Sequence, residues 1–262
     1  MPTTQRQARP AATARGVSTV DQRSGGDSWH ERGLHARVLN SLGQEIVDAG
    51  YTPGQILNLD ELGGRYAVSR SVLREALRVL QSLGMVEPRQ RVGTQVLPRE
   101  AWDLMNPQII EWRGRGAGYF TQMRELLELR LGIEPVAARL SARAMTSEQI
   151  DGIAKAAETM VEADLAKDAR GFLDADVRFH SLILTGSGNT VMGHFAGTVE
   201  ALLRTRVEER RFTITEHTPP SAHRHNQLAH ALGERDGDAA YTWSYELIEA
   251  TLHEFVKEAP GP

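Results

Sequence analysis

The chain has 262 residues, enough for two domains of ordinary size, and its 40% hydrophobic content is typical of a globular protein. It contains no cysteine, which excludes disulfides and thiolate chemistry and fits a cytoplasmic protein. No apolar run approaches the roughly 20 residues that cross a bilayer, so we expect no membrane partner. The net charge of −4 divides unevenly, because residues 1–98 hold 12 arginines and 9 acids, whereas residues 99–262 hold 18 basic residues and 25 acids. A basic first part joined to an acidic second part indicates two tasks in one chain.

The first elements are a tail and two helices. Residues 1–28 lack apolar periodicity and predict a disordered N-terminal tail, for which a basic arm touching DNA is the alternative. Apolar residues from Leu34 to Ile46 recur at helical spacing, and "YTPG" ends that helix. Asn58, with Glu61 three positions later, has the pattern of a capping box, which predicts a second short helix to about Tyr66.

A third helix is expected from the N-cap Ser69 to about Gly84, followed by a hairpin in "MVEPRQRVGTQVLP". Three helices and a hairpin within residues 29–98 predict a winged helix-turn-helix. Arg70, Arg74 and Arg78 recur every four residues and therefore share one face of the third helix. That face can contact phosphates and guanine edges, and the alternative is a solvated surface with pairing to Glu75.

The stretch "VSRSVLREALRVLQSLGMVEPRQRVGTQV" resembles the DNA-binding domain of the GntR family of bacterial transcription regulators. In that family a Ser/Thr-Arg start, an Arg-Glu-Ala-Leu core and a glycine-tipped wing recur. One departure concerns the preceding helix, where the family usually carries a DNA-contacting arginine and this sequence has Asp60. The resemblance implies DNA contacts by residues of the recognition helix and of the wing, which are Ser69, Arg70, Ser71, Arg74, Arg91, Gly93 and Thr94.

Residues 99–118 are expected to connect this domain to a second one. Pro107 is expected to break the connector, and its apolar side chains Trp102, Ile109, Ile110 and Trp112 are expected to pack against other parts of the chain. From Tyr119 onward the spacing is helical almost throughout, with helices at about 147–166, 169–185, 189–212, 220–233 and 236–257. Residues 119–258 therefore predict an antiparallel all-α bundle, and the whole chain is mainly α.

Asp176 and His180 are four positions apart, so one helical turn presents both side chains together. Such a pair can hold a cation, although an acid and a histidine at this spacing are commoner as a surface pair. Apolar neighbours indicate that the helix is buried. His225 lies on a later helix, where Leu228 and Leu232 indicate that it can point inward.

The segments "ELLELRLGIEPVAARLSARAMT", "DADVRFHSLILTGSGN" and "HNQLAHALGERDGDAA" resemble the FCD ligand-binding domain of the FadR subfamily. In many members an Asp, a His four residues later and two further histidines hold a divalent metal. Asp176, His180 and His225 occupy the first three places, and Leu247 stands where the last histidine is expected. The resemblance implies a metal of the Zn, Ni or Mn class, and the alternative is an effector bound without metal.

Two further side chains are candidates for effector binding. Helical spacing predicts one apolar stripe formed by Leu126, Leu129, Ile133, Val136, Ala137 and Leu140. Arg130 lies on that stripe, where it can clamp a carboxylate or form an i, i+4 salt bridge with Glu134. Asn189 follows "GSG" and can bind an effector or cap the next helix.

These features predict a homodimeric repressor that binds an inverted-repeat operator in double-stranded DNA and leaves it when a small anionic metabolite binds. The connector "WDLMNPQIIEWR" resembles that of sugar-acid regulators of the gluconate or galactonate type, which implies a sugar acid as effector. One alternative is an acyl-CoA-responsive regulator of the same subfamily. The other is an enzyme, a metal-dependent helical-bundle hydrolase that would activate water at Asp176, His180 and His225.

Overall fold

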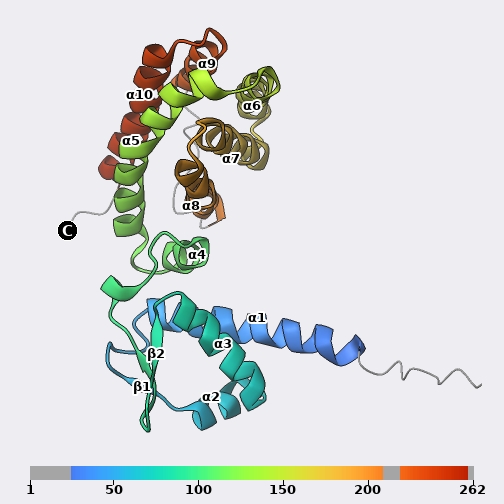
Figure 1. Ribbon diagram of the computed structural model, residues 1–262, viewed down its shortest axis with the longest axis vertical. Helices are drawn as coiled ribbons and strands as arrows, with labels where there is room; N and C mark the ends of the chain where they lie inside the picture. The colour runs from blue at the N-terminus through green and yellow to red at the C-terminus, as the bar shows by residue number, and fades with distance from the viewer. Residues whose placement is uncertain (1–24, 209–218, 259–262) are drawn as a thin grey trace, which may run out of the picture.

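The computed structural model describes residues 25–208 and 219–258, which form ten α-helices, one 3₁₀ turn and a three-stranded sheet. Figure 1 shows an N-terminal unit that runs from α1 to β3, a helical bundle that runs from α5 to α10, and α4 between them. Most of the predicted tail, residues 1–24, lies outside the described residues. The first helix begins at Gly25, earlier than its apolar periodicity indicates.

Side-chain caps set the helix starts of the N-terminal unit. The Asn58 side chain accepts hydrogen bonds from the backbone N–H groups of Asp60 and Glu61, and the Ser69 hydroxyl accepts one from Val72. These caps confirm the predicted starts of the second and third helices. The unit comprises α1 (Gly25–Val47), β1 (Ile56–Leu57), α2 (Leu59–Tyr66), α3 (Arg70–Ser82), β2 (Val86–Arg89) and β3 (Gly93–Val96).

The predicted hairpin is confirmed, and it belongs to a slightly larger sheet. Strands β2 and β3 pair antiparallel, with Val86 opposite Val96 and Arg89 opposite Gly93. The two-residue strand β1 pairs with the other edge of β3, so β3 is central in the order β1-β3-β2. Two residues carry too little pattern for the sequence to reveal β1.

The connector contains the 3₁₀ turn Arg99–Ala101 and the helix α4, Pro107–Arg115. The predicted break at Pro107 is wrong, because Pro107 begins the helix α4, which Asn106 caps. Proline suits the first position of a helix, because the N–H group that it lacks would have no partner there. Ile109 and Trp112 are fully buried in the core of the N-terminal unit, whereas Ile110 is buried in a cluster with residues of α5, α8 and α10. Helix α4 is therefore shared between two hydrophobic cores.

Contact between α1 and α4 depends on a glycine. A Cβ atom added at Gly43 would lie 2.5 Å from the Trp112 ring, too close for any side chain. We expect Gly43→Ala to lower the free energy of unfolding of the full chain by about 1–3 kcal/mol because the junction becomes overpacked. Gly33→Ala is the control, since open space surrounds that α1 glycine and alanine favours a helix there. Urea unfolding of both variants tests this, and equal midpoints would contradict it.

The bundle helices match their predicted ranges within a few residues. They are α5 (Tyr119–Ala144), α6 (Ser147–Ala166), α7 (Ala169–Gly186), α8 (Thr190–Glu208), α9 (Pro219–Gly233) and α10 (Gly237–Glu258). The expected extension of the eighth helix to residue 212 lies outside the described residues. No helix in the described parts of the chain combines the length and apolar composition needed to cross a membrane.

The predicted apolar stripe of α5 is wrong at Val136 and Leu140, whereas Ala137 is buried as predicted. Val136 and Leu140 remain 39% and 37% exposed, although their spacing places them with Leu126 and Ile133. Beyond Pro135 the buried face of α5 instead runs through small residues, which allow the neighbouring helices to approach closely. These buried small residues are Ala137, Ala138, Ser141 and Ala142.

Candidate DNA-contact surface and metal centre

Helix α3 has one buried face and one face of arginines. Five apolar side chains of α3 lie in the core of the N-terminal unit, among them Leu73, Ala76 and Leu80, which are fully buried. Arg70, Arg74 and Arg78 are exposed on the other side of the helix. We call these three residues the arginine face. The predicted separation of arginines from core residues is therefore present.

The three arginines have different partners. Arg70 Nη2 lies 2.6 Å from Asp60 Oδ1 of α2, and Arg78 pairs with Glu75 on its own helix. Arg74 has no hydrogen bond or ion pair within the described part of the chain. Its five N–H donors are therefore available to an external acceptor such as a phosphate or a base edge.

The other predicted DNA-contact residues lie at the start of α3 and at the wing. At the N-terminus of α3, Oγ of Ser69 and Oγ of Ser71 are hydrogen-bonded to each other at 2.8 Å. Arg91 is exposed in the turn between β2 and β3 with a φ of +62°. Gly93 has a φ of +127°, and a Cβ atom there would lie 3.1 Å from Ile56, so this position favours glycine. Thr94 lies in the central strand β3, opposite Pro88 of β2, and is half-buried.

The bundle brings together the three predicted metal ligands. Asp176, His180 and His225 are all buried, and each offers one ligand atom within 4.8 Å of the others. We call them the triad. Nε2 of His180 and Nε2 of His225 lie 3.2 and 3.1 Å from the same oxygen, Oδ1 of Asp176. Two helices far apart in sequence, α7 and α9, therefore converge on one carboxylate.

The remaining ring nitrogens also meet acceptors. Nδ1 of His180 lies 2.6 Å from Glu134 Oε2, and Nδ1 of His225 lies 2.9 Å from the backbone oxygen of Ser221. Carboxylate and carbonyl oxygens only accept, so each ring needs two N–H donors, one more than a neutral imidazole has. A cation bound by Asp176 Oδ1 and by Nε2 of both histidines would leave each Nδ1 to donate to its own acceptor, which is the usual arrangement of a metal-bound histidine.

Glu134 links the triad to Arg130. Its carboxylate is fully buried and accepts from Arg130 Nε at 2.5 Å and from Nη2 at 3.4 Å. Burial raises the pKa of Glu134, but Arg130 and His180 outweigh it and hold that pKa at about 2. Burial also raises the pKa of Asp176, but hydrogen bonds from His180 and His225 outweigh this effect and lower that pKa. Both carboxylates are therefore ionised in the folded protein.

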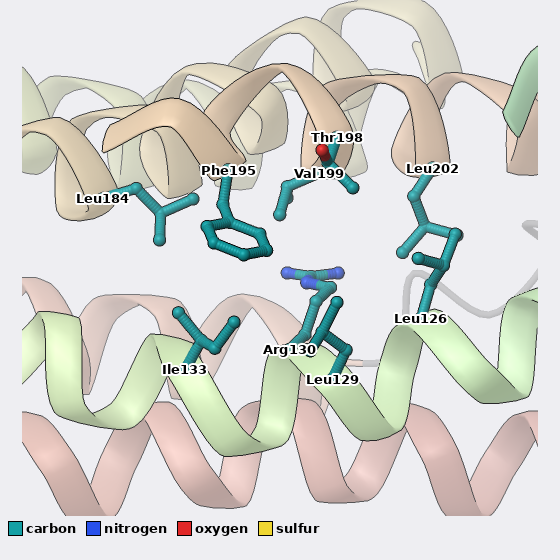
Figure 2. A pocket seen from close by; sticks show the side chains of 9 residues that line it. All are labelled: Leu126, Leu129, Arg130, Ile133, Leu184, Phe195, Thr198, Val199 and Leu202. Atoms are coloured by element: carbon teal, nitrogen blue, oxygen red, sulfur yellow. The ribbon is translucent and has the colours of Figure 1, made fainter. Parts of the chain in front are cut away.

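Arg130 also faces an apolar pocket between α5 and α8. Figure 2 shows its guanidinium group extending from α5 into the space below Phe195 and Val199. Arg130 is 5% exposed, and its Nε and Nη2 atoms donate to Glu134. Apart from Arg130 and Thr198, the lining side chains are apolar and include Leu126, Leu129, Ile133, Phe195, Val199 and Leu202.

The other candidate, Asn189, belongs neither to the triad nor to the lining of the α5–α8 pocket. Asn189 is exposed and caps α8, since its Oδ1 accepts from the N–H groups of Val191 and Met192. Leu247 is buried in the bundle core, so that position supplies no fourth ligand. His223 and His230 of α9 are exposed.

Sequence reasoning missed two partners of the histidines. Glu134 was visible as an i, i+4 partner of Arg130, but its contact with His180 spans 46 residues. Ser221 contributes a backbone oxygen, which no side-chain pattern reveals.

Two stretches of the chain match known families. Residues 34–96 match the bacterial regulatory proteins of the gntR family, and residues 125–250 match the FCD domain. The uncharacterized HTH-type transcriptional regulator YieP of Escherichia coli (strain K12) is 30% identical over 226 residues, covering 84% of this chain and 94% of that protein. The galactonate operon transcriptional repressor of the same strain is 28% identical over 216 residues, covering 82% and 93%.

A solved structure of Lar, which controls the expression of the Listeria monocytogenes agr system, has a TM-score of 0.60 and 17% identity. It covers 86% of this chain and 97% of that one, and at this identity the likeness shows the fold alone. The arrangement of a winged helix-turn-helix before a helical bundle is thus found elsewhere. The sequence matches show that the chain belongs to the gntR family of bacterial transcription regulators and carries an FCD domain.

Proposed function

We propose that this regulator is a repressor that binds an inverted-repeat operator as a homodimer and leaves it when a small carboxylate binds in the bundle. The division of labour follows the proposed boundaries, with DNA contact in residues 29–98, a connector in 99–118, and effector binding and dimerisation in 119–258. The name of the galactonate operon repressor supports the direction of regulation. Two subunits are needed because one short recognition helix reads only a few base pairs.

The observation that supports DNA reading is the arginine face, which is held outward by a buried opposite face and an N-cap. In the major groove, arginines give bidentate hydrogen bonds to guanine and contacts to phosphates. Arg74 lies one turn into α3 and has no partner in the described structure, so we assign it the central contact. The serines at the N-terminus of α3 and the wing residues would fix the orientation of the domain on the backbone.

We expect Arg74→Ala to weaken operator binding by about 1–3 kcal/mol. Fluorescence anisotropy with DNA from upstream of the protein's own gene, or with duplexes selected by the wild type, measures this loss. Arg178→Ala is the matched control, because Arg178 is exposed on α7 in the bundle. If both variants bound the selected duplex as tightly as the wild type, α3 would not be the recognition helix.

The triad supports a divalent cation. Asp176, His180 and His225 would hold it, with Glu134 and Ser221 fixing which nitrogen of each histidine faces the ion. Two imidazoles and a carboxylate suit Zn, Ni or Mn rather than Ca or Mg. With three protein ligands, such an ion would offer an open position to an oxygen of an anionic effector.

The α5–α8 pocket supports a link between effector binding and movement. In this conformation the pocket has a cavity volume of about 10 Å³, roughly what one water molecule needs. A carboxylate larger than water that reaches Arg130 must therefore separate α8 from α5. Because packed interfaces are bistable rather than elastic, such a separation would shift α8 as a unit.

Helix α8 can transmit that shift to the N-terminal unit. The Thr198 hydroxyl, on the pocket side of α8, donates to the backbone oxygen of Met105 at 2.8 Å, just before α4. On α4, the Trp112 indole donates to Asn40 of α1 and its ring packs on Gly43. Movement of α8 would thus reach α1 and, through the shared core, α3.

Two effector classes are supported by different observations. A sugar acid is supported by the galactonate repressor among the relatives. An acyl chain is supported by the apolar lining of the pocket around a single buried guanidinium. A thermal-shift panel of gluconate, galactonate, short aliphatic carboxylates and acyl-CoAs separates these classes. We expect DNA to be released only by compounds that are carboxylates and that also stabilise the protein. If no compound of the panel both stabilised the protein and released DNA, this would contradict an effector-controlled repressor.

A further inference from the structure

An acidic side chain lies within the proposed DNA-contact surface. Asp60, in the first turn of α2, places Oδ1 2.6 Å from Arg70 Nη2 at the start of α3. Both side chains are 70% exposed. The two helix starts that form the pair are each fixed by a cap, Asn58 for α2 and Ser69 for α3. The pair therefore bridges the two helices on an exposed face of the domain.

Stability does not account for this arrangement. An exposed ion pair contributes about 0–1 kcal/mol, and salt screens it further. An acid in the first turn favours α2 through the helix dipole, but Glu61 already supplies one there. Neither effect requires the carboxylate to contact an arginine of the next helix. Facing DNA, the same carboxylate would repel phosphates and lower affinity for every sequence.

We propose that Asp60 is a positioning residue for base recognition, an inference that rests on the proposed repressor function. It holds the guanidinium of Arg70 so that the remaining N–H donors meet O6 and N7 of one guanine in each half-site. Arginine has five donors, so one bond to Asp60 leaves enough for a bidentate contact with guanine. A guanidinium that is already oriented loses less conformational freedom when it binds.

The proposal predicts opposite effects on two kinds of DNA. Removing the charge of Asp60 reduces repulsion of phosphates, so binding to unrelated sequences should strengthen. Releasing Arg70 weakens its contact with guanine, so discrimination at that base pair should fall. A residue that acted only through its charge would change the affinity for all sequences in the same direction and leave the preferred bases unchanged.

The test uses duplexes selected from a random library by the full-length wild type. Asp60→Ala, which leaves Arg70 no acceptor at this position, should lower the preference for guanine at one symmetric pair of positions about tenfold. Arg70→Ala should lose the same preference, and the double variant should lose no more than Arg70→Ala alone. Glu61→Gln is the matched control, since it removes a neighbouring charge, keeps an oxygen for Asn58 and should select the same bases.

Unchanged base preference in Asp60→Ala, with tighter binding to every duplex, would overturn the proposal. So would a loss in the double variant that equals the sum of the single losses. Failure of the wild type to enrich any sequence would instead reject the repressor function, so the two failures are distinguishable. Thermal melting of each variant shows whether the fold is kept, which is expected because both side chains are exposed.

Discussion

Replacing Arg130 with methionine should lower the free energy of unfolding by about 3 kcal/mol and abolish the response to effector. The loss of stability follows from the position of Glu134, which is fully buried and would keep its charge without its strongest partner. Glu134 keeps its contact with His180, so the loss of stability should lie at the lower end of the range for breaking a buried ion pair. Urea unfolding measures the first effect, and release of DNA by the stabilising carboxylate measures the second.

Two further variants separate the structural role of Arg130 from its proposed role as a clamp. Arg139→Met, also on α5, breaks an exposed ion pair with Asp238 of α10 and should cost less than about 1 kcal/mol. The double variant Arg130→Met/Glu134→Gln removes the buried charge and should regain most of the stability. It should nevertheless fail to respond to effector. A double variant that responded normally would show that Arg130 serves only the salt bridge.

At the proposed metal centre, replacing His180 with alanine should reduce the metal content of the protein to a small fraction of that of the wild type, because it removes one of the three proposed ligands. DNA binding without effector should persist, because the triad lies in the bundle and the arginine face lies in the N-terminal unit. Release by effector should weaken. Metal content by mass spectrometry after exposure to Zn, Ni and Mn gives a readout that does not depend on DNA.

His223→Ala is the control for metal content, since His223 is exposed on α9 near Trp243. Asp176→Asn provides a second test that keeps the volume of the buried side chain, and it should also lose metal. Full metal content in both His180→Ala and Asp176→Asn would contradict the proposed centre. Loss of DNA binding by a folded His180→Ala would contradict the division of labour between the two parts.

The sequence was most informative where local chemistry decides structure. The caps at Asn58 and Ser69 set the starts of α2 and α3, because short polar side chains there satisfy free backbone N–H groups. The four-residue spacing of the arginines fixed their common face without any tertiary information. The GntR and FCD resemblances are confirmed. The hydrolase alternative is rejected, because the chain belongs to a family of transcription regulators.

The sequence was least informative where packing decides. Beyond Pro135 the buried face of α5 depends on the helices that it packs against, so Val136 and Leu140 are exposed. No local stretch of the sequence contains that information. For Arg130, both alternatives remain compatible with the structure, because the guanidinium binds Glu134 and still faces the pocket. The link from Glu134 to His180 required α5 and α7 to be placed together.

Selection of DNA fragments by the whole chain at two salt concentrations shows most directly whether α3 reads DNA. We expect enrichment of fragments that share an inverted repeat, with an affinity that falls as the salt concentration rises. We expect Arg74→Ala to lose this enrichment. Equal recovery of all fragments by a folded wild type, at either salt concentration, would contradict the claim that α3 reads DNA.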